Sequence, residues 1–483
     1  MKVYSFKKDS IVSDKILKSK NSNIITTSIR SLHLVKDHPD YQNYLTNYSI
    51  FLLIFNTFKR LLLSIFYSFS SIKNLRSKDL PKKQVIFISH LINRNNIFDK
   101  NDFYYGNLQE ILKKNKISNM RILLNHVNSS QNFQINRLKK DTVIFNNILD
   151  FKSELKIIYL QFVEFVKLVK RYFNSKNNIE KKIIKNALRS VFEYQTTFAL
   201  RTSYQLEKVI KIMDPKIFIC TYEGYSWERL CFKTLKNYSK NITCLGYHHT
   251  PIIKSNYAIK RNLKNNYDPD FIWCSNQNSL NEFLSSKKLK KKQVINFGSP
   301  KKIFKKKTNI KIKISKTCLV IPEGTYSECF KLFNFSLMYA LNHSSFKFVW
   351  RVHPIIDLKK LLSFLKISPN NLPKNISISR NNNIKKDMMK TSFVLYRGSG
   401  AVIDCISNGL TPIYLNMQKN VNIDPIYKIK TNNYVTSIQD FKKLTELHIN
   451  KKRLNYNLSR KINNNYLQKL EINKLIKFIN KFK

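Results

Sequence analysis

Glutamates stand at two points of the chain where a short apolar run ends in a Glu-Gly pair. The pairs are Glu223-Gly224 and Glu323-Gly324, and each is followed by a second glutamate five positions after the first, Glu228 or Glu328. A glutamate at the carboxyl end of a strand, beside a glycine that permits a tight turn, lies where open α/β sheets bind ligands. Because the unit occurs twice, the sequence predicts two similar α/β domains with a cleft between them.

Glu223 follows the first apolar run and is our candidate for a general base. A carboxylate in an interdomain cleft can take the proton from an acceptor hydroxyl as that hydroxyl attacks. The alternative is a glutamate that stabilises the start of the following helix, where a negative charge is favourable. We expect Glu228 to have a structural or positioning role. Glu323, at the equivalent place in the second half, could accept hydrogen bonds from ribose hydroxyls or a base amine.

A second candidate site is the Gly398-Ser399-Gly400 turn, which lies between an apolar strand and a helix. Ser399 is a natural N-cap and Gly409 a natural helix stop. The free N–H groups of the helix would bind a phosphate, and the glycines would let the backbone approach it closely. An ordinary strand-to-helix turn is the alternative. The spacing matches neither a P-loop nor a full dinucleotide fingerprint, so it does not indicate an ATPase or a dehydrogenase.

A histidine follows another predicted strand of the second half, in Arg351-Val-His353-Pro354. Pro354 ends the strand and leaves His353 at the carboxyl edge of the sheet with a free imidazole. This imidazole could donate to a phosphate oxygen and support a departing nucleotide, although a structural histidine is the alternative. Arg351 and Arg397 would either help to neutralise the phosphate or pair with neighbouring carboxylates.

Two adjacent histidines, His248 and His249, follow a strand of the first half. Two imidazoles could contribute to a metal site, but no carboxylate or cysteine stands at ligand spacing from them, so we expect no metal. We assign both histidines, together with Gly224 and Glu228, to the acceptor side of the cleft.

These residues need strands that alternate with helices, and the sequence shows that alternation in both halves, which predicts parallel sheets. The predicted strands are 84–90, 120–126, 216–220, 242–247, 271–275, 294–298, 317–321, 346–352, 376–378, 393–397 and 411–415. The predicted helices are 105–112, 151–173, 178–213, 227–237, 278–288, 328–342 and 400–408. The predicted division is an N-terminal extension at 1–83, a Rossmann-like acceptor domain at 84–300, a basic linker at 301–316, a Rossmann-like nucleotide-donor domain at 317–430 and C-terminal helices at 431–483.

The composition fits two folded domains with a strongly basic charge. Of 483 residues 43% are hydrophobic, and only 8 are glycine and 12 proline, which argues against long flexible linkers. The formal charge is +56. Compositional drift toward Lys, Asn and Ile is our favoured explanation, ahead of attraction to an anionic membrane or substrate, and ahead of nucleic-acid binding. The seven cysteines form no C-x-x-C pair, which is typical of a reducing compartment, and the polar N-terminus contains no cleavable signal peptide.

The segment 49–72 is the membrane candidate in the sequence. Its apolar run is interrupted by charges, so it is a poor spanning helix. Thr57, Arg60, Ser64 and Ser68 recur at helical spacing as one polar stripe, which predicts an amphipathic helix. We favour a helix that packs on the domain over one that lies in the membrane interface.

The acidic-Gly motif at Glu223-Gly224, the His-Pro motif at His353-Pro354 and the serine-containing turn at Ser399 resemble those of bacterial GT-B glycosyltransferases. The most similar kinds use CMP-activated sugars, as sialyltransferases and Kdo transferases do, and the CDP-glycerol glycerophosphotransferases share the second half. The resemblance covers about residues 84–430. It implies that Glu223 is the catalytic base and that His353 and Ser399 bind the donor phosphate.

The resemblance implies a metal-independent, inverting glycosyltransferase of bacterial surface polysaccharide synthesis. The donor would be a nucleotide-sugar, with a nonulosonic acid or Kdo-type sugar on CMP favoured, and the acceptor a surface glycan or a lipid-linked glycan. No other cofactor is expected. We expect a cytoplasmic location with peripheral contact at the inner face of the plasma membrane. The alternatives are a CDP-glycerol-type glycerophosphotransferase or UDP-sugar epimerase on the same scaffold, and a basic nucleic-acid-binding protein.

Overall fold

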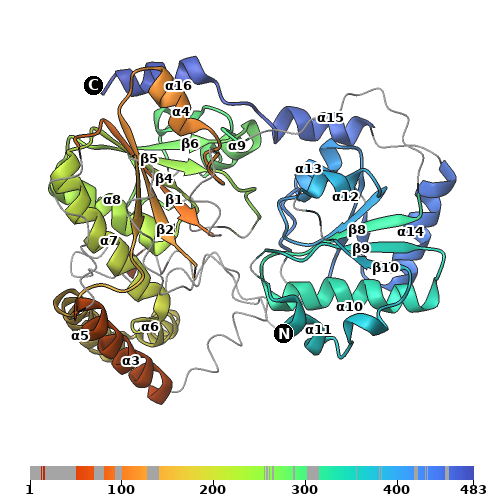
Figure 1. The fold of residues 1–483 in the computed structure, drawn as a ribbon, viewed down its shortest axis with the longest axis horizontal. Coiled ribbons are helices and arrows are strands. Elements are labelled where there is room, and N and C mark those ends of the chain that lie inside the picture. Colours follow the sequence, from red (N-terminus) through yellow and green to blue (C-terminus); the bar gives the residue numbers. More distant parts are fainter. Residues whose placement is uncertain are drawn as a thin grey trace.

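Two α/β domains lie side by side in the computed structural model (Figure 1). The structure describes residues 12, 15–16, 50–69, 81–92, 101–127, 141–254, 256, 259, 261–263, 266–286, 289–301, 315–354, 356–379, 381, 383–417, 422–429, 431, 433–451 and 456–482.

The first domain is built on a seven-stranded parallel sheet with the order β3-β2-β1-β4-β5-β6-β7. Helices cover both faces of this sheet, and for this reason its strands are apolar runs rather than alternating patterns. The strands are β1 (Val85–Leu91), β2 (Asn119–Asn125), β3 (Thr142–Phe145), β4 (Ile217–Thr221), β5 (Thr243–His248), β6 (Phe271–Cys274) and β7 (Val294–Asn296).

The second domain has a six-stranded parallel sheet with the order β10-β9-β8-β11-β12-β13. Its two faces carry separate apolar clusters, so this domain has its own core. The strands are β8 (Thr317–Ile321), β9 (Lys347–Trp350), β10 (Ile376–Ile378), β11 (Phe393–Tyr396), β12 (Thr411–Leu415) and β13 (Tyr434–Val435).

Both sheets have the strand order of a Rossmann-like domain. The first strand of each lies in the middle, the next two strands lie on one side of it, and the fourth lies on the other side. The order therefore reverses between β1 and β4 in the first sheet and between β8 and β11 in the second. Ligands of open α/β sheets bind outside the carboxyl ends of the strands at such switch points. The predicted α/β class with two Rossmann-like domains is confirmed.

Helices pack on both sides of each sheet, as α7, α8 and α9 do on one face of the first sheet and α4 and α16 on the other. The bounds are α3 (Ile50–Phe69), α4 (Leu108–Lys114), α5 (Phe151–Asn174), α6 (Asn178–Ser190), α7 (Tyr194–Met213), α8 (Ser226–Tyr238), α9 (Gln277–Leu284), α10 (Tyr326–Asn342), α11 (Leu358–Phe364), α12 (Ile384–Met388), α13 (Val402–Ser407), α14 (Ile438–Lys451), α15 (Tyr456–Asn465) and α16 (Ile472–Asn480).

The C-terminal segment 431–483 is divided between the two domains. Its first part adds the edge strand β13 and helix α14, whose Phe441 is fully buried in the core of the second domain. Its last helix, α16, buries Leu475, Phe478 and Ile479 in the first domain. The chain thus crosses back between the domains near its end, as the blue segment in Figure 1 shows. The predicted C-terminal helices are present, but they complete both cores.

Four short elements were not predicted: β3, β13, α11 and α12. The predicted helix at 178–213 is in fact two helices, because Glu193 takes an extended conformation and begins α7. The helix predicted within 49–72 is α3. Most of the predicted linker, residues 302–314, lies outside the described residues, as does most of the N-terminal extension.

Candidate functional site

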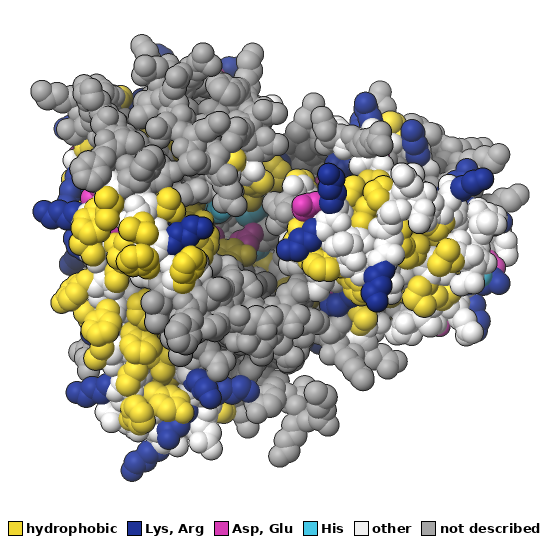
Figure 2. Space-filling model, turned by 60° about the horizontal axis from the view of Figure 1, so that its bottom comes forward, with side chains coloured by type: hydrophobic (Ala, Val, Ile, Leu, Met, Phe, Trp, Pro, Cys, Tyr) yellow, Lys and Arg dark blue, Asp and Glu magenta, His cyan; other side chains and the backbone are white. Residues whose placement is uncertain are grey.

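The loops at the carboxyl ends of the two sheets meet between the domains. Figure 2 shows a hollow there, with histidine and acidic side chains visible inside it. The loop after β5 reaches the second domain at Pro251, because a Cβ added to Gly400 would lie 3.2 Å from the Pro251 ring. The Gly398-Ser399-Gly400 turn therefore lies directly against the first domain.

Glu228 holds the turn that carries Glu223. Its carboxylate is fully buried and accepts hydrogen bonds from the backbone N–H groups of Glu223 (3.0 and 2.9 Å to its two oxygens), Gly224 (2.8 Å) and Tyr225 (2.8 Å). Gly224 has a φ of +85°, a conformation that glycine adopts without strain. Glu228 is the third residue of α8, and its bond from the N–H group of the N-cap residue Tyr225 is that of a capping box. The helix-start role that we considered for Glu223 is thus filled by Glu228.

The Glu223 carboxyl group lies just beyond β4, at the switch point of the first sheet. It accepts hydrogen bonds from the side chains of Tyr225 and Thr250, and its side chain keeps 19% of its surface exposed. Burial raises the pKa of Glu223, while these hydrogen bonds and the charge of Lys301 act in the opposite direction. A carboxylate with a raised pKa that still reaches solvent is suited to accept a proton.

The two adjacent histidines have different surroundings. His249 places its Nε2 atom 3.5 Å from Glu223 Oε1, and burial lowers the pKa of His249 well below its ordinary value. The ring is therefore neutral at pH 7, and the contact is not an ion pair. His248 is fully buried, with Nδ1 2.8 Å from the Tyr222 carbonyl oxygen. His249 thus belongs to the site, and His248 supports the backbone before Glu223.

A row of rings that we did not predict lines the carboxyl ends of β1 and β2. His90 Nδ1 lies 2.8 Å from His126 Nε2, and the two imidazoles stack with centroids 5.0 Å apart. Trp227 and Tyr104 contact His90 at 5.3 and 5.1 Å, and Tyr104 also contacts His249. Burial, followed by the neighbouring His126, lowers the pKa of His90 to about 3, so His90 is neutral at pH 7. Flat rings with a few polar atoms are typical of a ligand-binding wall.

Lys301 is a second residue that we did not single out. Its Nζ atom lies over the rings of Phe103 (4.9 Å) and Tyr104 (5.1 Å). Burial lowers the pKa of Lys301, and the charges of Asp404, Asp102 and Glu223 act in the opposite direction. Asp404 comes from α13 in the second domain, so the charges of carboxylates from both domains act on one lysine. In the sequence, Lys301 is hidden as the first residue of a lysine-rich run.

In the second domain, Glu323 and the glycine turn are in direct contact. A Cβ added to Gly398 would lie only 1.9 Å from Glu323 Oε1, so this carboxyl group packs against the bare backbone of the turn. Glu323 follows β8 and Gly398 follows β11, the two strands of the switch point. Two segments that the sequence separates by more than seventy residues therefore form one site.

Ser399 is not an N-cap, contrary to our prediction. Helix α13 begins at Val402 with Ala401 at the N-cap position and no capping side chain. The Ser399 carbonyl oxygen instead accepts a hydrogen bond from the Val402 N–H group (3.3 Å) in a turn before the helix. The predicted stop is confirmed, since Gly409 has a φ of +92° directly after the helix end.

The arginines predicted to help with the phosphate are both paired with carboxylates. Arg397 is 1% exposed and donates to Glu328 (2.6 Å) and to the Leu415 carbonyl oxygen (2.8 Å). Arg351 donates to Asp387 (2.7 Å) and to the Asn381 carbonyl oxygen (2.9 Å). This is the second of the two roles that we considered for them.

His353 is half-buried in the segment that follows β9, one strand away from the switch point. Burial lowers its pKa, so the ring is neutral at pH 7 and can donate one hydrogen bond.

Metal ligands do not gather in the described part of the chain: no three His, Cys, Asp or Glu side chains there could hold an ion together. The seven cysteines are buried and unpaired, and lie within strands and helices of the two cores.

No protein-family model matches the chain, and no curated protein matches it. Solved structures resemble it at low similarity. A UDP-GlcNAc 2-epimerase from Methanocaldococcus jannaschii, in complex with UDP-GlcNAc and UDP, has a TM-score of 0.48 and 12% identity, over 82% of this chain and 99% of its own. A mutant of TarM from S. aureus, in complex with UDP among other ligands, has a TM-score of 0.46 and 11% identity, over 83% of this chain and 100% of its own. The glycosyltransferase of kitacinnamycin has a TM-score of 0.45 and 8% identity, over 83% of this chain and 100% of its own. At these values the likeness carries no argument about activity.

Proposed function

We propose that the chain is a GT-B-type glycosyltransferase, which moves a sugar from a nucleotide donor to an acceptor hydroxyl with inversion. The observation that carries the proposal is the setting of Glu223. Its backbone is fixed by Glu228, its pKa is raised by burial, and it lies at the switch point of the first sheet, hydrogen-bonded to Thr250 in the loop that reaches the second domain at Pro251. A fixed position and a raised pKa both favour general-base catalysis by a carboxylate.

In the proposed reaction, the acceptor hydroxyl gives its proton to the Glu223 carboxylate as its oxygen attacks the anomeric carbon of the donor sugar. A new carbon–oxygen bond forms on one face of the sugar while the bond to the leaving phosphate breaks on the other. The phosphate leaves with the electron pair of that bond. His249, which is neutral and contacts Glu223, would orient the carboxylate.

The donor would lie on the second domain at the switch point between β8 and β11. We propose that the Gly398-Ser399-Gly400 turn and His353 hydrogen-bond to the phosphate, and that Glu323 accepts hydrogen bonds from ribose or base. Lys301 supplies a cation between the domains that can neutralise the leaving group. Because Asp387 already neutralises Arg351, we propose that Arg351 supports the His353 segment from behind.

The resemblance of the motifs favours a CMP-activated sugar and a surface glycan or lipid-linked acceptor. The ring wall of His90, His126, Trp227 and Tyr104 is the surface of the first domain on which such an acceptor would lie. We propose that transfer takes place at the inner face of the plasma membrane.

A UDP-sugar epimerase on the same scaffold is the second candidate, and one observation favours it. Asp404, on the second-domain side of Lys301, also has a pKa raised by burial. An epimerase moves protons on and off the sugar and needs acid and base groups on both sides of it, and Glu223 and Asp404 would supply them.

Two assays test the proposal. A thermal-shift screen against CMP, CDP, UDP and GDP identifies the nucleotide. The matching nucleotide-sugar is then incubated with the protein, with and without glycan acceptors. The proposal expects acceptor-dependent release of nucleotide with a new glycosidic product. An epimerised donor without transfer would establish the second candidate. Stabilisation by none of the four nucleotides would contradict both.

A further inference from the structure

Helices α3 and α5 pack side by side on the first domain with their polar sides turned inward. In α5 the buried residues include four polar ones, Ser153, Glu154, Gln161 and Glu164. In α3, Ser64 is fully buried and Thr57 and Arg60 are partly buried. The polar stripe that predicts an amphipathic helix thus faces the protein. Helix α3 packs on the first domain, as our favoured prediction has it, but it makes this contact with its polar side and not with its apolar side.

A hydrogen-bonded network explains why the polar sides are inside. Arg60 donates to Thr197 (2.8 Å) and Gln161 (3.3 Å) and forms an ion pair with Glu154 (3.3 Å). Glu154 also pairs with Arg201 at 2.6 Å and is fully buried. Buried charges are stable only when paired in this way. Burial lowers the pKa of Arg60 to about 10, so it keeps its charge at pH 7.

The outer sides of the same helices are apolar. Along each helix most of the exposed apolar residues recur every three or four positions, which places them on a single stripe. Leu63 in α3 and Leu160 in α5, which are 38% and 39% exposed, lie to one side of it. Within the stripe the exposed fractions are 62% for Phe55, 60% for Phe58, 52% for Leu62 and 36% for Ile65 in α3, and 43% for Leu155, 66% for Tyr159, 58% for Phe162, 50% for Val166 and 75% for Phe173 in α5.

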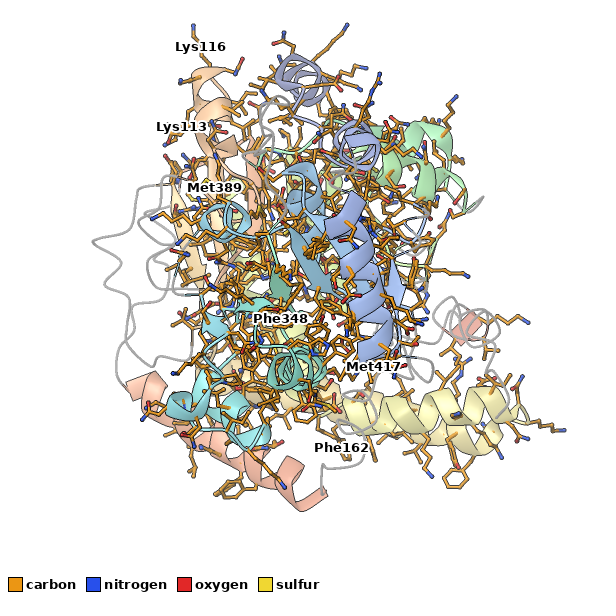
Figure 3. The ribbon with its side chains drawn as sticks, turned by 90° about the vertical axis from the view of Figure 1, so that its right-hand side faces the viewer. Lys113, Lys116, Phe162, Phe348, Met389 and Met417 are labelled. Carbon is orange, nitrogen blue, oxygen red and sulfur yellow. The ribbon has the colours of Figure 1, made fainter. Side chains whose placement is uncertain are left out.

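This surface, which we call the α3–α5 face, is visible in two figures. Figure 2 shows yellow side chains gathered on the side of the first domain where these helices lie, with dark blue side chains along the edges. Figure 3 labels Phe162 at the outer edge of α5. The five aromatic residues alone expose on the order of 500 Å², about as much as the largest apolar patch of a typical soluble monomer, and such patches mark interaction sites.

The charge next to the stripe is uniformly positive. Helix α3 contains no acidic residue, and both acidic residues of α5, Glu154 and Glu164, are buried. The exposed charges of the two helices are lysines, at Lys59, Lys152, Lys156, Lys167 and Lys170. An apolar stripe bordered by lysines without acidic partners is complementary to a bilayer interface that contains anionic lipids.

We propose that the α3–α5 face binds the surface of an anionic lipid bilayer, with both helices in the plane of the interface. The aromatic and leucine side chains lie at the acyl boundary and the lysines contact the headgroup phosphates. No helix of the described residues has the length and apolarity to cross a bilayer. The inference stands independently of the proposed reaction. It adds α5 to the membrane candidate of the sequence and names the side chains that insert.

Flotation of the full chain with vesicles tests this directly, with phosphatidylcholine vesicles compared to vesicles that contain phosphatidylglycerol as well. Binding is expected only with the anionic lipid, and it should weaken at high salt. The double variant Phe58→Ser, Phe162→Ser should reduce the partition coefficient by about tenfold or more, because two inserted rings are lost. The variant Leu341→Ser, Phe364→Ser is the control, since these side chains are 68% and 48% exposed on the second domain.

A second pair of variants separates the charge from the apolar stripe. Lys167→Gln with Lys170→Gln should weaken binding to anionic vesicles several-fold, whereas Lys442→Gln with Lys443→Gln on α14 should not. Failure of the parent to float, or equal binding of the Phe58→Ser, Phe162→Ser variant, would overturn the proposal. The proposal would also be overturned if the parent does not bind vesicles but forms a dimer in light scattering, and if the Phe58→Ser, Phe162→Ser variant is a monomer. The face would then bind a second copy of the chain.

Discussion

The turns after β4 and β8 have the same sequence pattern but hold their second glutamate in different ways. Glu228 and Glu328 are both the third residue of the following helix and both fully buried. Glu228 turns back onto its own turn and accepts from three successive backbone N–H groups. Glu328 instead pairs with Arg397 (2.6 Å) and Lys331 (2.7 Å).

The difference shows how each domain prepares its part of the site. In the first domain a single turn is fixed, so that one side chain, Glu223, is presented in a defined position. In the second domain Arg397 directly precedes Gly398, so its bond to Glu328 ties the turn after β8 to the turn after β11. The first arrangement suits a base that acts alone, and the second suits a ligand that contacts two turns at once.

The largest effect on stability is expected at the second turn. Glu328→Ala leaves the Arg397 charge buried without a partner, which should lower the free energy of unfolding by about 3–5 kcal/mol. Glu228→Ala removes an acceptor from backbone N–H groups and should cost about 1–3 kcal/mol. Urea unfolding measures both. If Glu228→Ala proves the more costly, the distinction between the two turns is wrong.

The next effect concerns the donor phosphate. Ser399→Ala and His353→Ala should each weaken binding of the nucleotide by about ten- to a hundredfold, because a hydrogen bond to a charged phosphate is worth roughly 1.5–3 kcal/mol. Calorimetry with the nucleotide and with the corresponding nucleoside isolates the phosphate. An equal loss for both ligands would instead indicate a contact with the base or a folding defect.

Two glycines of one turn give a matched comparison. Gly398→Ala would push its Cβ into the Glu323 carboxyl group, which lies 1.9 Å away, whereas Gly400→Ala meets Pro251 at 3.2 Å. Because the Glu323 side chain can move aside, we expect Gly398→Ala to cause little loss of stability. It should weaken binding of the nucleotide about tenfold, since the displaced Glu323 carboxyl group loses its hydrogen bond to the ligand. Gly400→Ala should change this affinity less. The reverse order would place the ligand at Pro251 rather than at Glu323.

The smallest effect is a shift in pH dependence. Glu223 must be deprotonated to act, so activity should fall as the pH drops through its raised pKa. The charge of Lys301 lowers this pKa, and Lys301→Met removes that charge, so the acid limb of kcat should move to higher pH. Lys442→Met, far from the site on an exposed part of α14, is the control. A limb that moves to lower pH would exclude Glu223 as the titrating group.

Most strands could be predicted from the sequence because buried parallel strands are apolar runs. The polar and glycine residues that follow these strands, such as Glu223, Glu323 and Gly398, could be predicted with them. The sequence could not show that His90 contacts Trp227, because His90 lies within the apolar run of β1 and Trp227 comes from a distant helix. It could not show the Glu328–Arg397 pair either. A carboxylate that follows one strand finds a cation that follows another only when the sheet order is known.

The orientation of α3 was equally beyond the sequence. The spacing of Thr57, Arg60 and Ser64 predicts one polar stripe, but the pattern does not say which side contacts the domain. That is decided by Glu154 and Thr197, on other helices, which offer partners to Arg60. In the same way, Lys301 could not be distinguished from the lysines beside it until its aromatic and acidic neighbours were known.

The most direct test of the account is the rate of sugar transfer by Glu223→Gln, measured together with its affinity for the nucleotide. Glutamine keeps the shape and the hydrogen bonds of the side chain but cannot take a proton. We predict a loss of roughly two to four orders of magnitude in kcat with a nearly unchanged nucleotide Kd. Glu446→Gln, on the exposed side of α14, should behave as the parent. Transfer by Glu223→Gln within about threefold of the parent would contradict the assignment of Glu223 as the base.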